Sequence, residues 1–432
     1  MKAGWLGLAA CLGLYAQGSS LVFRGARLIP VSGPEIAEGA LVVEGGKIRA
    51  VGAASGIEVP PGARVIDVRG KTIMPGLVDT HSHIGAPAGA DASGPIQPDV
   101  RILDSLNVRA ASLQKARSGG VTTVNIMPGS GHLLSGQTLY LKLREGRTIE
   151  DLLIHLPGGR AAGGMKMANG TNSRRAAPFP GTRGKSAALV REQFVKAQEY
   201  RAKLQQAGAD ASKKPPRDLR MEGLVEVLEG QRVVHFHTHR HDDILTVLRL
   251  QKEFGFKLVL QHVSDAWLVA PEIARAGVAS SLVLLDSPGG KIEAKDISFG
   301  NAAALEKAGA RFGFHTDDSV TDSRLFLRVA ALAVRAGCSR QKALEGLTLA
   351  GAEMLELQDR LGSLAPGKDA DFIILSGDPL SVYTHVEQTW VEGRKVFDRA
   401  DPKDRLYQTG GYGASHDDAD HAELHGEAEA AR

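Results

Sequence analysis

The sequence of 432 residues contains little cysteine, few aromatic residues and almost no surplus charge. Its two cysteines, Cys11 and Cys338, cannot form a disulfide framework, so the redox compartment is left open. Lysine and arginine total 52 against 49 aspartate and glutamate residues, which gives a formal net charge of +3. Because no cluster of basic residues is interleaved with aromatic ones, nothing in the sequence indicates a nucleic-acid partner.

The sequence also lacks a stable membrane span. The apolar run from Trp5 to Tyr15 is too short to cross a bilayer as a mature helix. One lysine precedes this run and small or polar residues follow it, which fits a signal peptide over residues 1–16 with cleavage near Ala16. "LAAC", which ends at Cys11, also resembles a lipoprotein signal box. We therefore predict export to the periplasm or the extracellular space, and a cytoplasmic protein if this segment is a misassigned start or a buried strand.

What the sequence does contain is typical of a large globular α/β chain. Hydrophobic residues make up 43% of it, charged residues 23%, and there are 51 glycines. Short β-type runs lie near both ends, and apolar strands alternate with helical patterns between them. The helical patterns cover Ala187–Ala207, His241–Phe254, Ala266–Ala276 and Asp322–Ala336. Repeated strand–helix units predict a parallel sheet, and their number predicts a (β/α)8 TIM barrel.

The segment "PGLVDTHSHIG" places two histidines two residues apart at the end of an apolar run. If the segment is extended, His81 and His83 point to the same face of the strand. Neutral imidazole is a common ligand of zinc and of similar divalent ions. Taken alone, the pair is more typical of two ordinary histidines bonded to backbone, so the context must decide.

The other strands of the predicted barrel supply that context. His235, His237 and His239 end a later strand, and His262 ends the next one in "LVLQHVSD". Asp317 ends the last strand in "FGFHTDD". Catalytic residues of a TIM barrel lie at the carboxyl ends of its strands. The joint pattern predicts a metal site at that end of the barrel.

With these residues, the chain resembles the amidohydrolase superfamily, and within it the imidazolonepropionase-like and prolidase-like branch. The resemblance runs from about Leu21 to about Arg399. It is carried by "PGLVDTHSHIG", "HTHRHDDIL", "LVLQHVSDAW", "HTDDSVTDSRLF" and "LGSLAPGKDADFIIL". It implies one or two divalent metal ions, usually zinc. The ligands that it implies are His81, His83, His237, His262 and Asp317.

The resemblance also implies how the chain is divided. Members of the superfamily have a barrel and a small β-sandwich that is built from both chain ends. The expected parts are a signal peptide (1–16), the first part of the sandwich (17–74), the barrel (75–358), the second part of the sandwich (359–400) and a disordered tail (401–432).

Two positions in the implied ligand set have alternatives. The strand with three histidines matches the family best with His237 as the ligand and His239 second, while His235 fits a satisfied core residue. Lys166, in "GGMKMANGTN", is the candidate for the carboxylated lysine that bridges two metals in some members. The alternative is an exposed or substrate-contacting lysine, since only burial keeps a lysine neutral enough to react.

Other polar residues are candidates for substrate contacts. His132, in a glycine-rich loop, could contact the substrate or face solvent, and His239 could do so if it is not a ligand. Arg174, with Arg175 and Arg183, could hold a substrate carboxylate or belong to a solvated loop. His315 would share the face of Asp317 and could support the ligands or simply pack.

The implied activity is that of a metal-dependent amidohydrolase. An activated water would hydrolyse a carbon–nitrogen bond in an amide, a cyclic amide or a dipeptide, with Asp317 as the general base and acid. The expected partner is a small molecule or a dipeptide, and a homo-oligomer is left open. Three alternatives are a phosphotriesterase-like hydrolase, a non-catalytic binding protein and a deaminase. Against the deaminase, Asp242 and Asp243 stand where a helix-borne histidine and glutamate would be expected.

Overall fold

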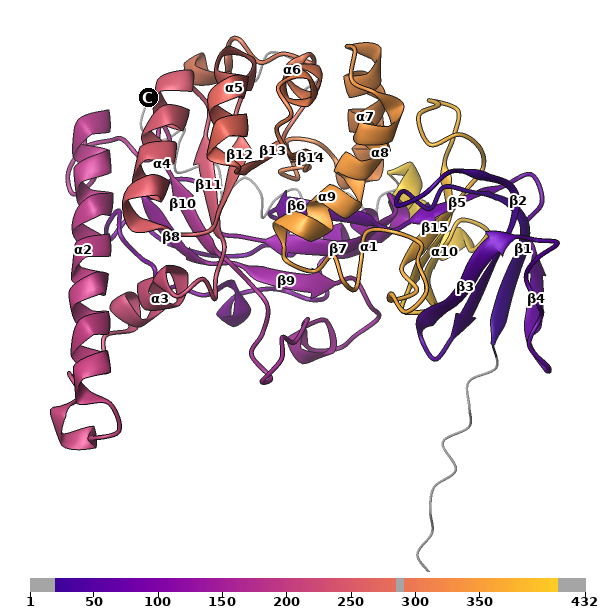
Figure 1. The fold of residues 1–432 in the computed structure, drawn as a ribbon, viewed down its shortest axis with the longest axis horizontal. Coiled ribbons are helices and arrows are strands. Elements are labelled where there is room, and N and C mark those ends of the chain that lie inside the picture. The colour runs from indigo at the N-terminus through magenta and orange to yellow at the C-terminus, as the bar shows by residue number, and fades with distance from the viewer. Residues whose placement is uncertain (1–19, 285–290, 411–432) are drawn as a thin grey trace, which may run out of the picture.

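The structure, a computed structural model, describes residues 20–284 and 291–410. Figure 1 shows a larger α/β part joined to a smaller sheet, which confirms the mixed α/β class. The predicted signal peptide (1–16) and the acidic tail beyond Gly410 lie outside the described residues. Within the described ranges, no helix combines the length and the apolar character needed to cross a membrane.

The smaller sheet, at the right of Figure 1, contains strands from both ends of the chain. Its order is β17-β16-β15-β5-β1-β2-β3, and β4 pairs with β1. Ile374 on β15 lies opposite Ile73 on β5 in an antiparallel pair. The rings of Phe23, Phe372 and Trp390 pack in its core. The strands are β1 (Leu21–Leu28), β2 (Ile36–Glu44), β3 (Lys47–Ala53), β4 (Arg64–Asp67), β5 (Thr72–Pro75), β15 (Phe372–Leu375), β16 (Val386–Val391) and β17 (Arg394–Asp398).

The larger part contains two further sheets. One has the order β14-β13-β12-β11-β10-β8, in which the strands from β10 to β14 are parallel. The other has the order β6-β7-β9, in which β6 and β7 are parallel. The strands are β6 (Leu77–Ser82), β7 (Val121–Ile126), β8 (Leu134–Gln137), β9 (Leu139–Lys142), β10 (Met165–Ala168), β11 (Val234–Thr238), β12 (Leu258–His262), β13 (Ala279–Leu282) and β14 (Phe312–Phe314).

These two sheets meet at both edges. Only Thr138 separates β8 from β9 along the chain. At the other edge, the backbone N–H of Asp317 donates to the carbonyl oxygen of His81 at 2.9 Å, and the backbone N–H of Thr316 donates to the Asp79 carboxylate at 3.1 Å. β8 and β9 each run antiparallel to a neighbour, which the alternation of strands and helices did not predict. The two hydrogen bonds from Thr316 and Asp317 hold the carboxyl end of β6 next to the segment that follows β14.

Helices follow the parallel strands and cover them. The predicted helices His241–Phe254 and Ala266–Ala276 begin and end at the expected residues. Buried side chains at Ile244, Val247 and Leu250 form the inner face of the first. The helices are α1 (Ala111–Ser118), α2 (Arg183–Ala207), α3 (Leu219–Leu228), α4 (His241–Phe254), α5 (Ala266–Ala276), α6 (Asn301–Lys307), α7 (Phe326–Arg335), α8 (Arg340–Leu347), α9 (Leu349–Met354) and α10 (Pro402–Thr409).

Helix α10 corrects the prediction of disorder from residue 401. The Asp401 carboxylate caps the helix by accepting the backbone N–H of Lys403. The amide of Gln408 donates to the carbonyl oxygens of Ser118 and Val386, which anchors α10 to α1 and β16. The acidic composition of the tail favoured disorder in the prediction. The contacts that stabilise this short helix involve residues far away in the sequence, so local composition did not reveal them.

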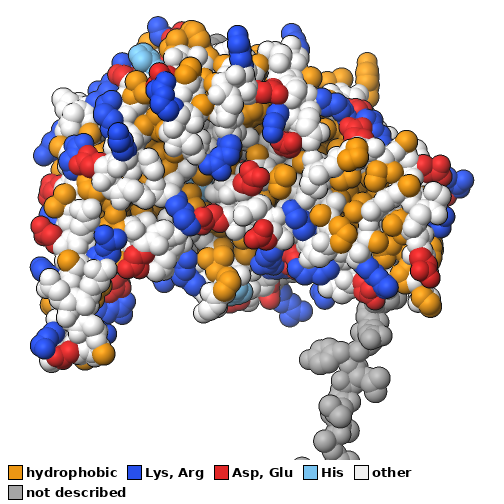
Figure 2. Space-filling model, in the orientation of Figure 1, with side chains coloured by type: hydrophobic (Ala, Val, Ile, Leu, Met, Phe, Trp, Pro, Cys, Tyr) orange, Lys and Arg blue, Asp and Glu red, His pale blue; other side chains and the backbone are white. Residues whose placement is uncertain are grey.

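Basic and acidic side chains are interspersed on the face shown in Figure 2. This agrees with the small formal net charge of +3. On this face, the charge pattern gives no sign of a surface suited to a polyanion.

A buried ion cluster joins the larger part to the smaller sheet. Lys142, at the end of β9, has a fully buried side chain, and its Nζ lies 2.9 Å from Asp371 and 3.2 Å from Glu392. It also pairs with Asp369, just before β15. Burial alone would lower the pKa of Lys142, but the three carboxylates outweigh burial and raise it. The amine is therefore charged, and it compensates acids from the other part of the molecule.

We expect Lys142→Met to lower the free energy of unfolding by about 3–5 kcal/mol, because it removes the buried cation of this cluster and leaves the buried carboxylate of Asp371 unpaired. Lys47 pairs with the same Asp369, but its side chain is 50% exposed, so Lys47→Met should cost less than about 1 kcal/mol. Urea denaturation of the two variants measures the difference. Equal losses would show that the burial of Lys142 does not matter.

Candidate metal centre

The candidate site lies where several strands end. His81 is on β6, Lys166 on β10, His237 on β11 and His262 on β12, while Asp317 follows β14. The histidines and the lysine are almost completely buried. Because parallel strands present their carboxyl ends at one edge, residues from five strands reach the same region.

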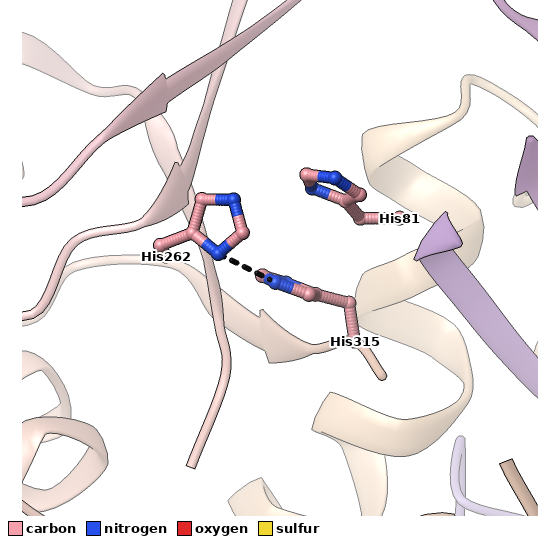
Figure 3. Close-up of side chains that lie close together, drawn as sticks. All are labelled: His81, His262 and His315. Carbon is pink, nitrogen blue, oxygen red and sulfur yellow. Dashed lines mark hydrogen bonds between the residues drawn. The ribbon is translucent and has the colours of Figure 1, made fainter. Parts of the chain in front are cut away.

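Three groups of residues in this region could hold a metal ion. In each, the ligand atoms lie within 4.8 Å of one another. The groups are His81, His83 and Asp317; His237, His239 and His262; and His81, His262 and His315. Figure 3 shows the last group, with the three rings directed toward one another from different elements. His81 and His262 each belong to two groups, so the groups form one continuous cluster.

Hydrogen bonds to the Nδ1 atoms orient the first pair of histidines. His83 Nδ1 bonds to the carbonyl oxygen of Met127 at 2.8 Å, and His81 Nδ1 bonds to Gln261 Oε1 at 3.3 Å. Both partners are acceptors, so each Nδ1 carries the proton and each Nε2 of the neutral ring has a lone pair. These Nε2 atoms lie 3.1 Å and 3.4 Å from Asp317 Oδ1, another acceptor. Acceptors that face each other in this way need either a shared proton or a metal cation between them.

The second group leaves ring nitrogens without protein partners. His239 Nδ1 bonds to Ser264 Oγ at 2.7 Å, and His262 Nδ1 lies 3.2 Å from His315 Nε2. The Nε2 atoms of His239 and His262 and both ring nitrogens of His237 are buried with no hydrogen-bond partner among the described residues. An unpaired buried polar atom costs about 1–3 kcal/mol. Coordination of a metal would satisfy these atoms, so the residues fit such an ion.

Burial sets the charge state of the imidazoles. It lowers the pKa of His81, His237, His239 and His262 well below the ordinary value. These rings are therefore neutral at pH 7, as metal ligands must be. Asp317 is different: burial would raise its pKa, but hydrogen bonding and positive charge around it, first from His83 and then from His315 and Lys166, outweigh burial and lower its pKa, so the carboxylate is ionised.

Lys166 is buried among neutral groups. Its Nζ lies 2.9 Å from His81 Nε2 and 3.0 Å from Met127 Sδ. Burial lowers the pKa of Lys166 to about 7. A large fraction of the amine is therefore unprotonated at neutral pH, which is the form that can react with carbon dioxide.

Two further histidines support the cluster. His235 Nε2 bonds to the Tyr140 hydroxyl at 2.8 Å and His235 Nδ1 to Gln261 Nε2 at 3.0 Å, so both of its nitrogens are satisfied. His315 lies between His262 and Ser281, whose Oγ is 2.8 Å from His315 Nδ1. Burial lowers the pKa of both histidines to about 3.

The predicted substrate-contacting residues lie in different surroundings. His132 Nε2 bonds to the carbonyl oxygen of Asp91 at 2.6 Å, and its ring packs near Phe179. Arg174 Nε donates to the Gly170 carbonyl at 3.1 Å. The Arg175 guanidinium stacks 3.7 Å from the centre of the Phe179 ring. These residues lie on the loops after β7 and β10.

Gln261, which no sequence motif singled out, connects His81 to His235. Strict alternation would place Gln261 and His262 on opposite faces of β12. However, His262 has φ of +72° and Val263 has φ of +41°, so the strand ends in left-handed geometry. Both side chains consequently reach the cluster. The only sequence signal was the position of a polar residue inside the buried run "LVLQH".

The parallel α/β architecture and the buried histidine–carboxylate cluster define a candidate metalloenzyme. Residues 188–397 match the model of the Amidohydrolase family. An amidohydrolase from Thermotoga maritima superposes with a TM-score of 0.82 at 33% identity, and the alignment covers 88% of this chain and 100% of that one. The chain belongs to the amidohydrolase superfamily, as its motifs predicted.

Curated relatives carry several different activities in their names. Amidohydrolase tasK of Hapsidospora irregularis is 29% identical over 79% of this chain, which spans only 38% of that protein. A 5-methylthioadenosine/S-adenosylhomocysteine deaminase of Symbiobacterium thermophilum is 24% identical, and the match covers 83% of this chain and 85% of the deaminase. An imidazolonepropionase of Anaeromyxobacter dehalogenans is 27% identical over 80% of this chain and 86% of its own length. Their names share hydrolysis at carbon–nitrogen bonds and differ in substrate.

We expect zinc to stabilise the metal-free protein. At a free zinc concentration of 100 times Kd, the gain is about 2.7 kcal/mol. Magnesium, which prefers oxygen ligands, should have little effect. Differential scanning calorimetry with each ion measures this, and the double variant His81→Ala/His83→Ala should lose the zinc effect. Equal stabilisation by magnesium would contradict a site built mainly from imidazoles.

Proposed function

We propose that the protein is a metal-dependent hydrolase of a carbon–nitrogen bond in a small amide, a cyclic amide or a dipeptide. Superfamily membership supports the reaction class. The observation that carries the metal is the set of imidazole Nε2 atoms that face Asp317 or lack a partner. The proposed ligands are His81, His83, His237, His262 and Asp317.

Zinc suits this ligand set, because zinc accepts imidazole nitrogen and carboxylate oxygen. A bound divalent ion would supply Lewis acidity and lower the pKa of water toward 7. The chain would hold it on the edge formed by β6, β11 and β12, which we propose is the mouth of a (β/α)8 barrel. Gln261 and Met127 would keep the Nε2 atoms of His81 and His83 turned inward through their bonds to Nδ1.

Asp317 would move the proton. Its lowered pKa keeps the carboxylate ionised at neutral pH, so it can accept a proton from the attacking water. The same oxygen would then donate this proton to the leaving nitrogen. Its side chain is 16% exposed, whereas that of His81 is fully buried, so the carboxylate is the group with access to a substrate.

Deamination is the second candidate, because a deaminase is among the relatives. Asp242 and Asp243 occupy the helix that follows β11, but each pairs with an arginine: Asp242 with Arg240 at 2.9 Å and Asp243 with Arg183 at 2.8 Å. These pairings leave both carboxylates engaged away from the histidines, which favours an amide substrate over an aminopurine.

A screen of zinc-loaded protein tests the proposal. Dipeptides, N-acyl amino acids and cyclic amides should be hydrolysed with release of a new amine. Aminopurine nucleosides should release no ammonia, and a phosphotriester should release no alcohol. Ammonia from a nucleoside as the dominant product would replace the proposal with deamination, and absence of all turnover would favour a binding protein.

We expect Asp317→Asn to retain bound metal while turnover falls about 10²–10⁴-fold, because the amide cannot accept the proton. Asp318 is the matched control: its carboxylate accepts the backbone N–H of Ser323 at 2.9 Å and so supports the loop. Asp318→Asn should keep most activity. Metal analysis and steady-state kinetics measure both variants. An inactive Asp318→Asn beside an active Asp317→Asn would place the proton carrier one residue further along.

Lys166 decides the number of ions. If its amine is carboxylated, it can bridge two metals, and Lys166→Met should lower the metal content from two ions per chain to one or less. Metal analysis measures this, and ¹³C NMR with labelled bicarbonate should show a carbamate signal in the wild type only. Lys185, which is exposed at the start of α2, supplies the control Lys185→Met. One ion per chain in both wild type and Lys166→Met would place Lys166 outside the ligand set.

A further inference from the structure

Two segments that are distant in the sequence meet beside the histidine cluster. One is the loop after β10, and the other begins at Lys291, after β13. Glu293 is buried and accepts the backbone N–H of Thr171 at 2.7 Å. Gly170 permits this approach, because a Cβ there would lie 2.5 Å from Glu293 Oε2. Glu293 therefore pins the second segment to the first.

Lys291 is positioned by this junction. Its Nζ donates to Asn172 Oδ1 at 3.0 Å. The carboxylate of Glu293 is 3.9 Å away, beyond hydrogen-bond distance, although it still offsets part of the charge. An ammonium group has three N–H donors, and this hydrogen bond uses one of them. The side chain is 36% exposed, so a ligand can reach it.

Lys291 stands close to the proposed catalytic groups. β13, which precedes it, lies between β12 and β14 in the sheet; His262 ends β12, and Asp317 follows β14. The positive charge of Lys291 also contributes to the lowered pKa of His237 and His239. The amine is therefore within electrostatic range of the cluster.

A cation at this position is unfavourable unless an anion joins it. Among the described residues, Asp317 is the one carboxylate in the three candidate metal groups. The formal charges of a divalent ion, Asp317, Lys291 and the nearby Glu293 would sum to +1 before hydroxide or substrate binds, and a second ion with a carboxylated Lys166 would raise the sum to +2. A buried site with a net positive charge attracts a negatively charged ligand.

The three arginines that were predicted to hold a substrate carboxylate have contacts of their own within the protein. Arg183 pairs with Asp243 at 2.8 Å, and Arg175 stacks on Phe179. Arg174 donates through Nε to the Gly170 carbonyl. Each contact engages part of a guanidinium, and a role of the three arginines in holding a substrate carboxylate stays a prediction.

We propose that Lys291, held by Asn172, binds a carboxylate of the substrate next to the scissile bond. The inference rests on the proposed hydrolytic function and narrows its substrates to anionic ones, such as N-acyl amino acids and dipeptides. Neutral cyclic amides and nucleosides would lack the group that Lys291 binds. A charge-assisted hydrogen bond of this kind corresponds to about 10- to 100-fold in affinity.

The test uses N-acetyl-L-leucine and N-acetyl-L-leucinamide, which differ only in carboxylate against carboxamide. The probes carry an apolar side chain because two exposed apolar side chains, Trp267 at the start of α5 and Ile292 after β13, are available to contact it. Binding to the metal-free full chain is measured by calorimetry, which does not depend on turnover. The kcat and KM of the zinc-loaded protein are then measured with both probes.

In the wild type, the acid should bind about 10- to 100-fold more tightly than the amide, with the difference in KM rather than in kcat. Lys291→Met should abolish this preference while leaving the amide unchanged, and Lys291→Arg should keep most of it. Lys295→Met is the matched control, because Lys295 lies on the same segment with a side chain that is 65% exposed. It should behave as the wild type.

Three results would overturn the proposal: no preference for the acid in the wild type, including failure to bind either probe; a preference that survives in Lys291→Met; or equal weakening of both probes in that variant. The last would mean that Lys291 only supports the fold. If the metal-free protein prefers the acid but the zinc-loaded protein hydrolyses no amide, then the proposed function fails and the carboxylate site stands.

Discussion

The buried imidazoles of His237, His239 and His262, whose Nε2 atoms have no hydrogen-bond partner among the described residues, are the constraint on which the rest of this structure depends. A neutral histidine can satisfy one nitrogen through Nδ1, and Met127, Gln261 and Ser264 accept or share those bonds. The remaining lone pairs point at each other and at Asp317. Only a cation can satisfy these lone pairs together. The hydrogen bonds to the Nδ1 atoms fix the orientation of the rings, so they determine where a cation can bind to the Nε2 atoms.

The backbone contributes to this convergence. His262 and Asp317 adopt φ of +72° and +50°, in a region that costs a residue with a side chain roughly 1–3 kcal/mol. Both lie at strand ends that are held by neighbouring elements, because the N–H of Asp317 donates to the carbonyl of His81 on β6. The rigid packing of β6 against the end of β14 thus maintains a conformation that a free loop would abandon.

Three lysines in the larger part show how surroundings determine the behaviour of the same amine. Lys142 faces three carboxylates, and its pKa is raised despite burial. Lys166 is equally buried, but its two hydrogen-bond partners are neutral, and burial lowers its pKa to about 7. Lys291 is partly exposed and bonded to an amide oxygen. The first suits a structural ion pair, the second a chemical modification, and the third a charged ligand.

Periodicity and residue type in the sequence by themselves determined the α/β class, the bounds of α4 and α5, and the histidines at strand ends, because these depend on neighbours within a few residues. Tertiary structure alone decided which nitrogens are satisfied and which are not. Asn172 and Lys291 are 119 residues apart, and His81 and Gln261 are 180 apart. No local pattern encodes such pairs. The pairing of Arg183 with Asp243 and the contacts that anchor α10 could not be predicted for the same reason. Strand register and left-handed strand ends are likewise set by packing between segments that are distant in the sequence.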